Sequence, residues 1–204
     1  MIDLDTAKAH LRVTDGSEDT AIGIYLKSAI ASVQKMTGKL LAPAQVKQVV
    51  AGFPGWTGYR GGYAGSGYWN GDCARIGGVD PIRLWYGPID AATAALMIEY
   101  DDPNGAATPL TDFRIIEGSN AKLLPAYGSY WPIAQSADGS VRIAYTAGYA
   151  DGQVPPELDQ AVLYLVGHYF ENRNAVEAGL RAAAVEIPLA VADLIAPYRP
   201  VGIF

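Results

Sequence analysis

The residues that could do chemistry are few and lie far apart in the chain. The sequence holds two histidines, His10 and His168, and one cysteine, Cys73. No Ser/His/Asp, Cys/His or HExxH arrangement accompanies them, and a catalytic centre needs several such groups together. We interpret both histidines as helix residues, with His168 hydrogen-bonded and half-buried. The sequence therefore predicts a protein that is not an enzyme, with no catalytic residue, no metal site and no cofactor.

Two adjacent acids, Asp101 and Asp102, are a second feature with possible chemistry. Neighbouring carboxylates can hold a metal ion or act as an acid pair. Here Pro103, Asn104 and Gly105 follow directly, and this combination is typical of a turn. We interpret the pair as the solvated tip of a hairpin.

A glycine-rich, aromatic stretch over residues 55–80 is the third feature. It lacks the GxxxxGK[ST] phosphate loop. It could be a sugar-stacking platform, a surface on which single-stranded nucleic acid stacks, an interface that orders against a neighbour, or a plain surface loop. An interface is the favoured functional interpretation, and a carbohydrate-binding module is the alternative function. The aromatic residues are Trp56, Tyr59, Tyr63, Tyr68 and Trp69.

Composition narrows the class of protein. The 204 residues are half hydrophobic and carry a net charge of −6. This balance argues against a protein that grips nucleic acid by its phosphates, which needs a basic surface. No apolar run approaches the roughly 18 residues of a membrane span. The acidic start of the chain, residues 1–5, does not look like a signal peptide, so synthesis in the cytoplasm is expected.

Helical periodicity marks both ends of the chain. Residues 4–13 predict a short helix capped by Asp5 or Thr6, and residues 17–38 a longer one capped by Ser17 and ended by Gly38. Residues 154–173 start with two prolines and keep an apolar face, which predicts a central helix. Residues 187–195 predict a last helix. Together they predict a helical core built from both termini.

The middle of the chain changes to short alternating segments separated by turn residues, which is typical of antiparallel strands. The expected strands cover residues 46–50, 82–86, 95–100, 113–116, 121–125 and 141–145. The predicted fold class is α+β, a helical bundle with a small antiparallel β subdomain inserted. The expected organisation is residues 1–43 and 151–197 for the helical core, 44–150 for the insertion and 198–204 for an apolar tail.

Several segments, in this order and spacing, resemble one protein family. They are Lys8-Ala9-His10-Leu11-Arg12-Val13, Glu18-Asp19-Thr20-Ala21-Ile22, Thr37-Gly38-Lys39-Leu40-Leu41, Ile143-Ala144-Tyr145-Thr146-Ala147-Gly148-Tyr149, Val154-Pro155-Pro156-Glu157-Leu158, His168-Tyr169-Phe170-Glu171-Asn172-Arg173, Ile187-Pro188 and Leu194-Ile195-Ala196-Pro197-Tyr198-Arg199. The chain resembles the head–tail connector (adaptor) family of tailed bacteriophages and phage-derived gene transfer agents. Residues 55–80 depart from the family pattern, so their role is not inherited.

The resemblance implies a structural ring of about a dozen copies between portal and tail, which lines the DNA channel. The implied partners are other copies, the portal protein and the next neck or tail protein (a stopper or tail terminator). DNA passes without specific binding, and no membrane is involved. The implied location is the neck of a virion or phage-like particle assembled in the bacterial cytoplasm.

The resemblance also suggests which residues make contacts. Besides the aromatic stretch, Glu171 and Arg173 are expected to be polar anchors toward a neighbouring subunit. The C-terminal segment is expected to dock on the portal through Tyr198, Arg199, Val201, Ile203 and Phe204.

Overall fold

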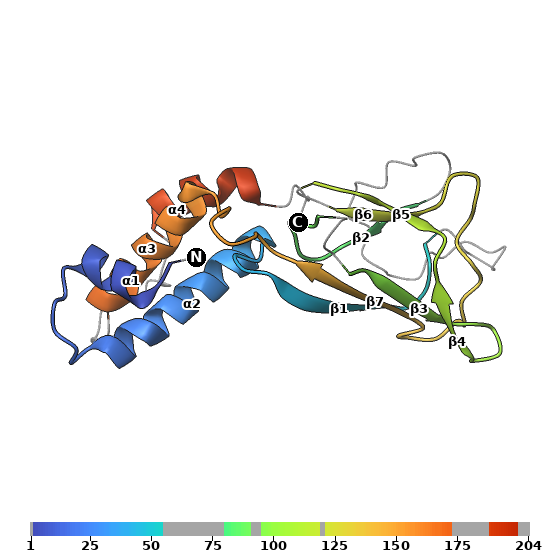
Figure 1. Ribbon diagram of the computed structural model, residues 1–204, viewed down its shortest axis with the longest axis horizontal. Coiled ribbons are helices and arrows are strands. Elements are labelled where there is room, and N and C mark those ends of the chain that lie inside the picture. Colours follow the sequence, from blue (N-terminus) through green and yellow to red (C-terminus); the bar gives the residue numbers. More distant parts are fainter. Residues whose placement is uncertain (1, 55–79, 91–94, 119–120, 173–187, 200–204) are drawn as a thin grey trace, which may run out of the picture. The chain divides into compact units, whose positions relative to one another are not determined.

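The computed structural model describes residues 2–54, 80–90, 95–118, 121–172 and 188–199 (Figure 1). The chain divides into two compact units. Met1–Ala42 and Tyr149–Arg199 form a helical unit, and the described residues from Pro43 to Gly148 form a β unit. This confirms the predicted α+β fold class, in which the ends of the chain make the helices and the middle makes the sheets.

The described residues of the helical unit form four α-helices and a short 3-10 helix. They are α1 (Leu4–Leu11), α2 (Asp19–Thr37), α3 (Pro156–Glu171), α4 (Leu189–Ile195) and η1 (Ala196–Tyr198). No helix among the described residues is both long enough and apolar enough to span a membrane.

The ends of the first two helices differ partly from the predicted caps. Asp3, not Asp5 or Thr6, caps α1, because its carboxylate accepts the Thr6 N–H at 2.8 Å. The predicted Ser17 cap of α2 is wrong, since Ser17 donates instead to the carboxylate of Asp15. Gly38 ends α2 as expected, with φ 65° and its N–H on the Gln34 carbonyl at 2.8 Å.

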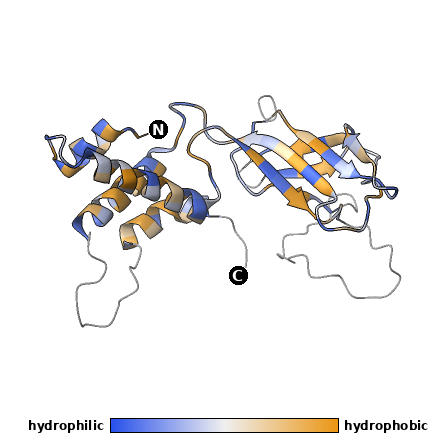
Figure 2. Ribbon diagram, turned by 90° about the horizontal axis from the view of Figure 1, so that it is seen from below, coloured by the Kyte–Doolittle hydropathy of each residue, from blue (hydrophilic) through white to orange (hydrophobic). Residues whose placement is uncertain are grey.

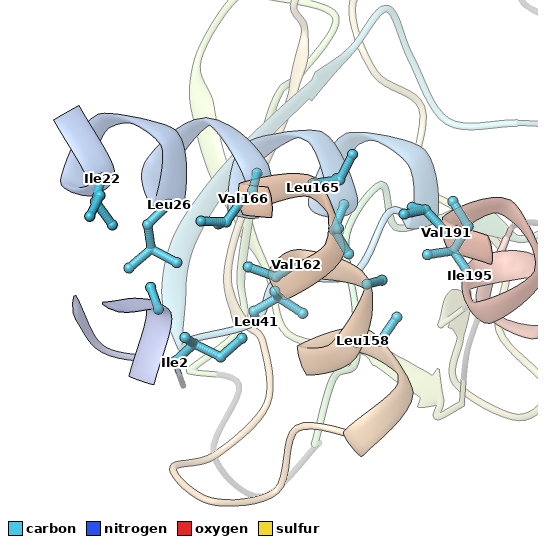
Figure 3. Close-up of a cluster of buried hydrophobic side chains, with 14 residues drawn as sticks. Ile2, Ile22, Leu26, Leu41, Leu158, Val162, Leu165, Val166, Val191 and Ile195 are labelled. Carbon is cyan, nitrogen blue, oxygen red and sulfur yellow. The ribbon is translucent and has the colours of Figure 1, made fainter. Parts of the chain in front are cut away.

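One apolar cluster holds the helical unit together (Figure 3). Ile22 of α2 and Leu158 and Val162 of α3 are all fully buried there. Ile195 of α4 joins them from a segment distant in sequence. Apolar residues recurring at the helical period supply these contacts, which makes α3 the centre of the unit. Each helix also carries hydrophilic residues beside its hydrophobic ones (Figure 2).

Within its described ranges, the β unit forms seven short strands in two antiparallel sheets. They are β1 (Ala44–Val50), β2 (Ile82–Arg83), β3 (Met97–Asp101), β4 (Ala107–Leu110), β5 (Phe113–Ile116), β6 (Lys122–Pro125) and β7 (Val141–Ala147). The four-stranded sheet has the order β1-β7-β3-β4, and the three-stranded sheet has the order β2-β6-β5.

The longest pairing joins β1 and β7, from Ala44 opposite Ala147 to Val50 opposite Val141. Every second residue of β7 is buried, and the residues between them are half-buried. This period of two is the expected signature of a sheet with one face on a core.

Two features of the β unit differ from the prediction. The strand expected over residues 82–86 stops at Arg83. Strand β4 was not predicted, and it contains Pro109. Proline cannot donate to a strand ladder, so it is tolerated at a sheet edge, and β4 is the outermost strand of its sheet.

Buried side chains explain why the strand ends early. The Gln48 amide donates to the Arg83 carbonyl at 2.9 Å and accepts the Trp85 N–H at 3.1 Å. The Tyr145 hydroxyl accepts the N–H of Tyr86 at 3.2 Å. Side chains of the four-stranded sheet therefore satisfy backbone groups that a neighbouring strand would otherwise bind.

Candidate functional site

The beginning of the predicted docking tail is fixed on the helical unit. Val191 and Ile195 of α4 are buried in the apolar cluster. The Tyr198 hydroxyl donates to Glu157 Oε2, in the first turn of α3, at 3.1 Å. Partial burial raises the pKa of Tyr198, and the Glu157 carboxylate raises it further. Tyr198 is thus a half-buried anchor from which the exposed Arg199 continues.

The remaining residues of the predicted tail, Val201, Ile203 and Phe204, lie outside the described residues. The structure therefore gives the start of the tail but not its end.

The end of α3 carries the predicted polar anchors. Glu171 is its last residue and is exposed, whereas Arg173 lies outside the described residues. Asn172, which the sequence did not single out, closes the helix. Its backbone N–H and its side-chain amide donate to the His168 carbonyl at 3.1 and 2.9 Å.

His168 is half-buried, as predicted. Its Nδ1 lies 3.3 Å from the Asn172 amide nitrogen. Its Nε2 is enclosed and has no hydrogen-bond partner within the described part of the chain. Among the described residues, the ring of His168 also lies beside Tyr169, with a centroid separation of 6.1 Å.

The aromatic residues of the stretch over 55–80, from Trp56 to Trp69, lie outside the described residues. Both the predicted interface and the carbohydrate-binding alternative depended on them, and the structure does not bear on either.

The acid pair separates into two structural roles. Asp102 accepts the backbone N–H groups of Asn104 and Ala106 at 2.8 and 2.9 Å, as expected at a turn. Asp101 is not a solvated tip residue, because it binds the Arg142 guanidinium at 2.7 and 2.9 Å. Within the ranges that the structure describes, no three His, Cys, Asp or Glu side chains could hold a metal ion together.

The sequence reasoning missed one surface of the β unit, which we call the tyrosine turn (residues 126–131). The Ser129 N–H closes the turn on the Ala126 carbonyl at 3.0 Å, with Gly128 at φ 80°. Tyr127 and Tyr130 are 86% and 82% exposed. Two exposed aromatic rings on one short turn form a local apolar surface, and larger surfaces of this kind mark contact sites. The pattern Tyr-Gly-Ser-Tyr between two strands is the signal that could have revealed this turn.

Buried and half-buried partners hold the tyrosine turn in place. Trp131 stacks on Phe53 with a centroid separation of 5.0 Å, and its Nε1 donates to the Asp80 carbonyl at 3.0 Å. On the other side, the guanidinium carbon of Arg114 lies 4.2 Å from the centre of the Tyr127 ring. The turn is thus braced at both ends.

The fold is similar to that of chains in solved gene transfer agent (GTA) particles. A chain in a structure described as the neck of an empty GTA particle, computed with C6 symmetry, has a TM-score of 0.70 and 24% identity. The match covers 100% of this chain and 91% of that one. Chains from the virion of a native gene transfer agent particle and from the neck of a native GTA particle, computed with C12 symmetry, have TM-scores of 0.69 and 0.65, also at 24% identity. These matches cover 100% and 98% of this chain, and 91% and 90% of the other chains.

A family model matches the beginning of the chain. Residues 1–55 match the family model described as phage gp6-like head-tail connector protein. The match and the shared fold confirm the predicted resemblance to the head–tail connector family. That family is structural rather than enzymatic, in agreement with the prediction that the protein is not an enzyme. No curated protein matches the chain.

Proposed function

We propose that the protein is a structural head–tail connector in the neck of a tailed phage or a gene transfer agent. The observation that carries this proposal is the fold shared over the full chain with neck chains of GTA particles. The connector match over residues 1–55 supports it independently from sequence.

In this proposal the protein acts as a ring between the portal and the tail. Cyclic symmetry is the usual outcome when identical subunits make head-to-tail contacts that close. The related necks were computed with C6 and C12 symmetry, which supports a ring of about twelve copies. Each subunit adds modest contacts, and the closed ring makes them collectively tight.

The C-terminal segment is the proposed portal contact. Its docking residues are Tyr198, Arg199, Val201, Ile203 and Phe204. The Tyr198–Glu157 hydrogen bond gives this segment a fixed starting point on the helical core. Another face of the ring would bind the next neck or tail protein, with Glu171, Arg173 and the aromatic stretch as candidate contacts.

The ring would enclose a channel through which DNA passes. The chain has 21 acidic and 15 basic residues and a net charge of −6. A surface whose charge is negative, like that of the phosphates, does not retain DNA. The proposed location is therefore the neck of the particle, after assembly in the bacterial cytoplasm.

Loss of the protein tests this function in a producing strain. Without the chain, we expect filled heads and separate tails, because the connection between them is missing. Electron microscopy of lysates measures the fraction of joined particles. Supplying the intact chain from a plasmid is the control and should restore joining. Normal joined particles in the absence of the chain would contradict the proposal.

A shortened chain tests the docking tail. Removal of residues 199–204 leaves Tyr198 and the buried face of α4 in place. The variant should therefore fold, with the circular dichroism spectrum of the intact protein, but fail to restore joined particles. If it restores them fully, the C-terminal segment is not the portal contact.

A further inference from the structure

We infer that the tyrosine turn together with Arg114 is a contact surface for a second copy of this chain. In this contact an acidic side chain of the second copy binds Arg114 beside the ring of Tyr127. The inference rests on the proposed ring, and it names a surface for its subunit contacts that lies within the β unit.

The tyrosine turn is preorganised for binding. The Ser129 hydroxyl donates to Asp112 Oδ2 at 2.9 Å, and the Ala126 N–H donates to the Asp112 carbonyl at 3.3 Å. With the stacked Trp131, these bonds hold the backbone of the turn before any partner arrives. A contact surface that is already ordered loses less conformational entropy on binding.

The tyrosine turn displays side chains that are typical of interfaces. Tyr127 and Tyr130 present large amphipathic rings to solvent within four residues. Tyrosine has few rotatable bonds for its contact area, and it is enriched in interfaces and in their energetic hot spots. Glycine and serine between such rings are also typical of adaptable binding loops.

Arg114 adds a positive charge to this surface. Within the described residues, its guanidinium donates to the Tyr127 hydroxyl at 3.4 Å. A guanidinium has five N–H donors and binds carboxylates in a planar, two-point geometry. Its position over the Tyr127 ring adds a cation–π attraction that fixes the group. The site is therefore suited to a carboxylate that arrives beside an aromatic ring.

A second copy of the chain supplies that chemistry. The chain has six more acidic than basic residues (21 against 15), so each copy offers carboxylates in excess. In a ring built by head-to-tail contacts, the turn of one copy meets a different surface of the next. The tyrosine turns therefore need no pairing with each other, and like charges need not meet.

Photo-crosslinking in cells that produce the protein tests the occupant directly. Tyr130 is replaced by the photoreactive p-benzoylphenylalanine, which keeps an aromatic ring at an 82% exposed position. After irradiation, mass spectrometry identifies the adduct. We expect an adduct between two copies of this chain. Adducts only to another protein or to DNA, or no adduct, would overturn the inference.

The same substitution at Trp85 is the matched control. Trp85 is 56% exposed in the β unit but lies outside the turn, and it should give markedly less self-adduct. An equal yield at both positions would show unspecific proximity and overturn the inference. The failure of this inference and the failure of the proposed function are distinguishable. If the chain forms the self-adduct, but a strain without the chain still makes joined particles, this contact stands and the proposed function is rejected.

Substitutions test the chemistry of the contact in the full chain. For these variants the photoreactive residue is placed at a third exposed position, because Tyr130 itself is changed. The double variant Tyr127→Ala, Tyr130→Ala should lower the yield of the self-adduct about tenfold, and so should the single variant Arg114→Glu. Tyr127→Phe keeps the ring and should retain most of the yield. Thermal unfolding of the double variant should match that of the intact protein, since both rings are exposed. Unchanged adduct yields in the double variant and in Arg114→Glu would overturn the inference.

Discussion

Arg142 forms the best-defined ion pair of the β unit. Its guanidinium meets both carboxylate oxygens of Asp101 on the neighbouring strand β3, and Glu99 Oε2 lies 3.9 Å from its Nε. The hydrogen bonds from Arg142 lower the pKa of Asp101 below its ordinary value of 3.8, against a smaller opposing effect of burial. Two-point pairing of this kind is stronger than an ordinary surface contact.

The lowered pKa gives this pair a pH signature. The ionised form of Asp101 is favoured in the folded state, so the pair stabilises the β unit above pH 3.8. That contribution is lost as the pH falls through the folded-state pKa. The variant Asp101→Asn should be less stable at pH 7, and its deficit should shrink as the pH falls below about 4.

Denaturant unfolding at several pH values measures this difference. Asp138→Asn, at an exposed site of the same unit, is the matched control and should follow the intact protein. A deficit for Asp101→Asn that stays constant down to pH 2 would contradict the assigned ion pair.

At the level of elements, Gln48 links the two sheets of the β unit. It lies in β1, is 1% exposed and binds the backbone on both sides of Leu84. A buried amide is stable only when its partners are in place, and its removal leaves their polar groups without hydrogen bonds.

Gln48→Ala should therefore lower the free energy of unfolding by about 1–3 kcal/mol, because two part-buried backbone groups lose their partner. Gln45→Ala changes the same residue type at an exposed position of the same strand and should cost less than about 0.5 kcal/mol. Urea denaturation of both variants checks this. Equal losses for the two variants would contradict the linking role of Gln48.

Periodicity in the sequence predicts most elements of this fold. The apolar face of α3 and the glycine that ends α2 depend on neighbours in the chain, so local patterns reveal them. The early end of β2 depends on Gln48, which lies 35 residues away. No local pattern contains such a contact. Strand β4 was missed because Pro109 is acceptable only at a sheet edge, and edge position is a property of the assembled sheet.

Of the candidate contact surfaces, local sequence patterns indicate one and miss the exposure of the other. The start of the C-terminal segment could be identified from its apolar composition and from the family resemblance. The pattern Tyr-Gly-Ser-Tyr indicates a turn, but not which of its aromatic rings are exposed, because exposed and buried aromatics look alike in sequence. Only the fold shows that Trp131 is 8% exposed while Tyr130, its neighbour, is 82% exposed.

At the level of the whole molecule, the chain combines two units with separate cores. The apolar cluster of the helical unit draws on both ends of the chain, whereas Ile98, Leu123 and Ile143 are buried within the β unit. A unit made from both termini keeps α4 and Tyr198 on the same core as the N-terminal helices. This arrangement suits the proposed docking tail, which starts at Tyr198.

Electron cryomicroscopy of the neck of assembled particles tests the central claim most directly. The account predicts a ring of this chain, about twelve copies, between portal and tail, with the C-terminal segment on the portal. The helical unit and the β unit should each fit the density as they are described. Particles whose neck density lacks this chain, or holds it away from the portal, would contradict the account.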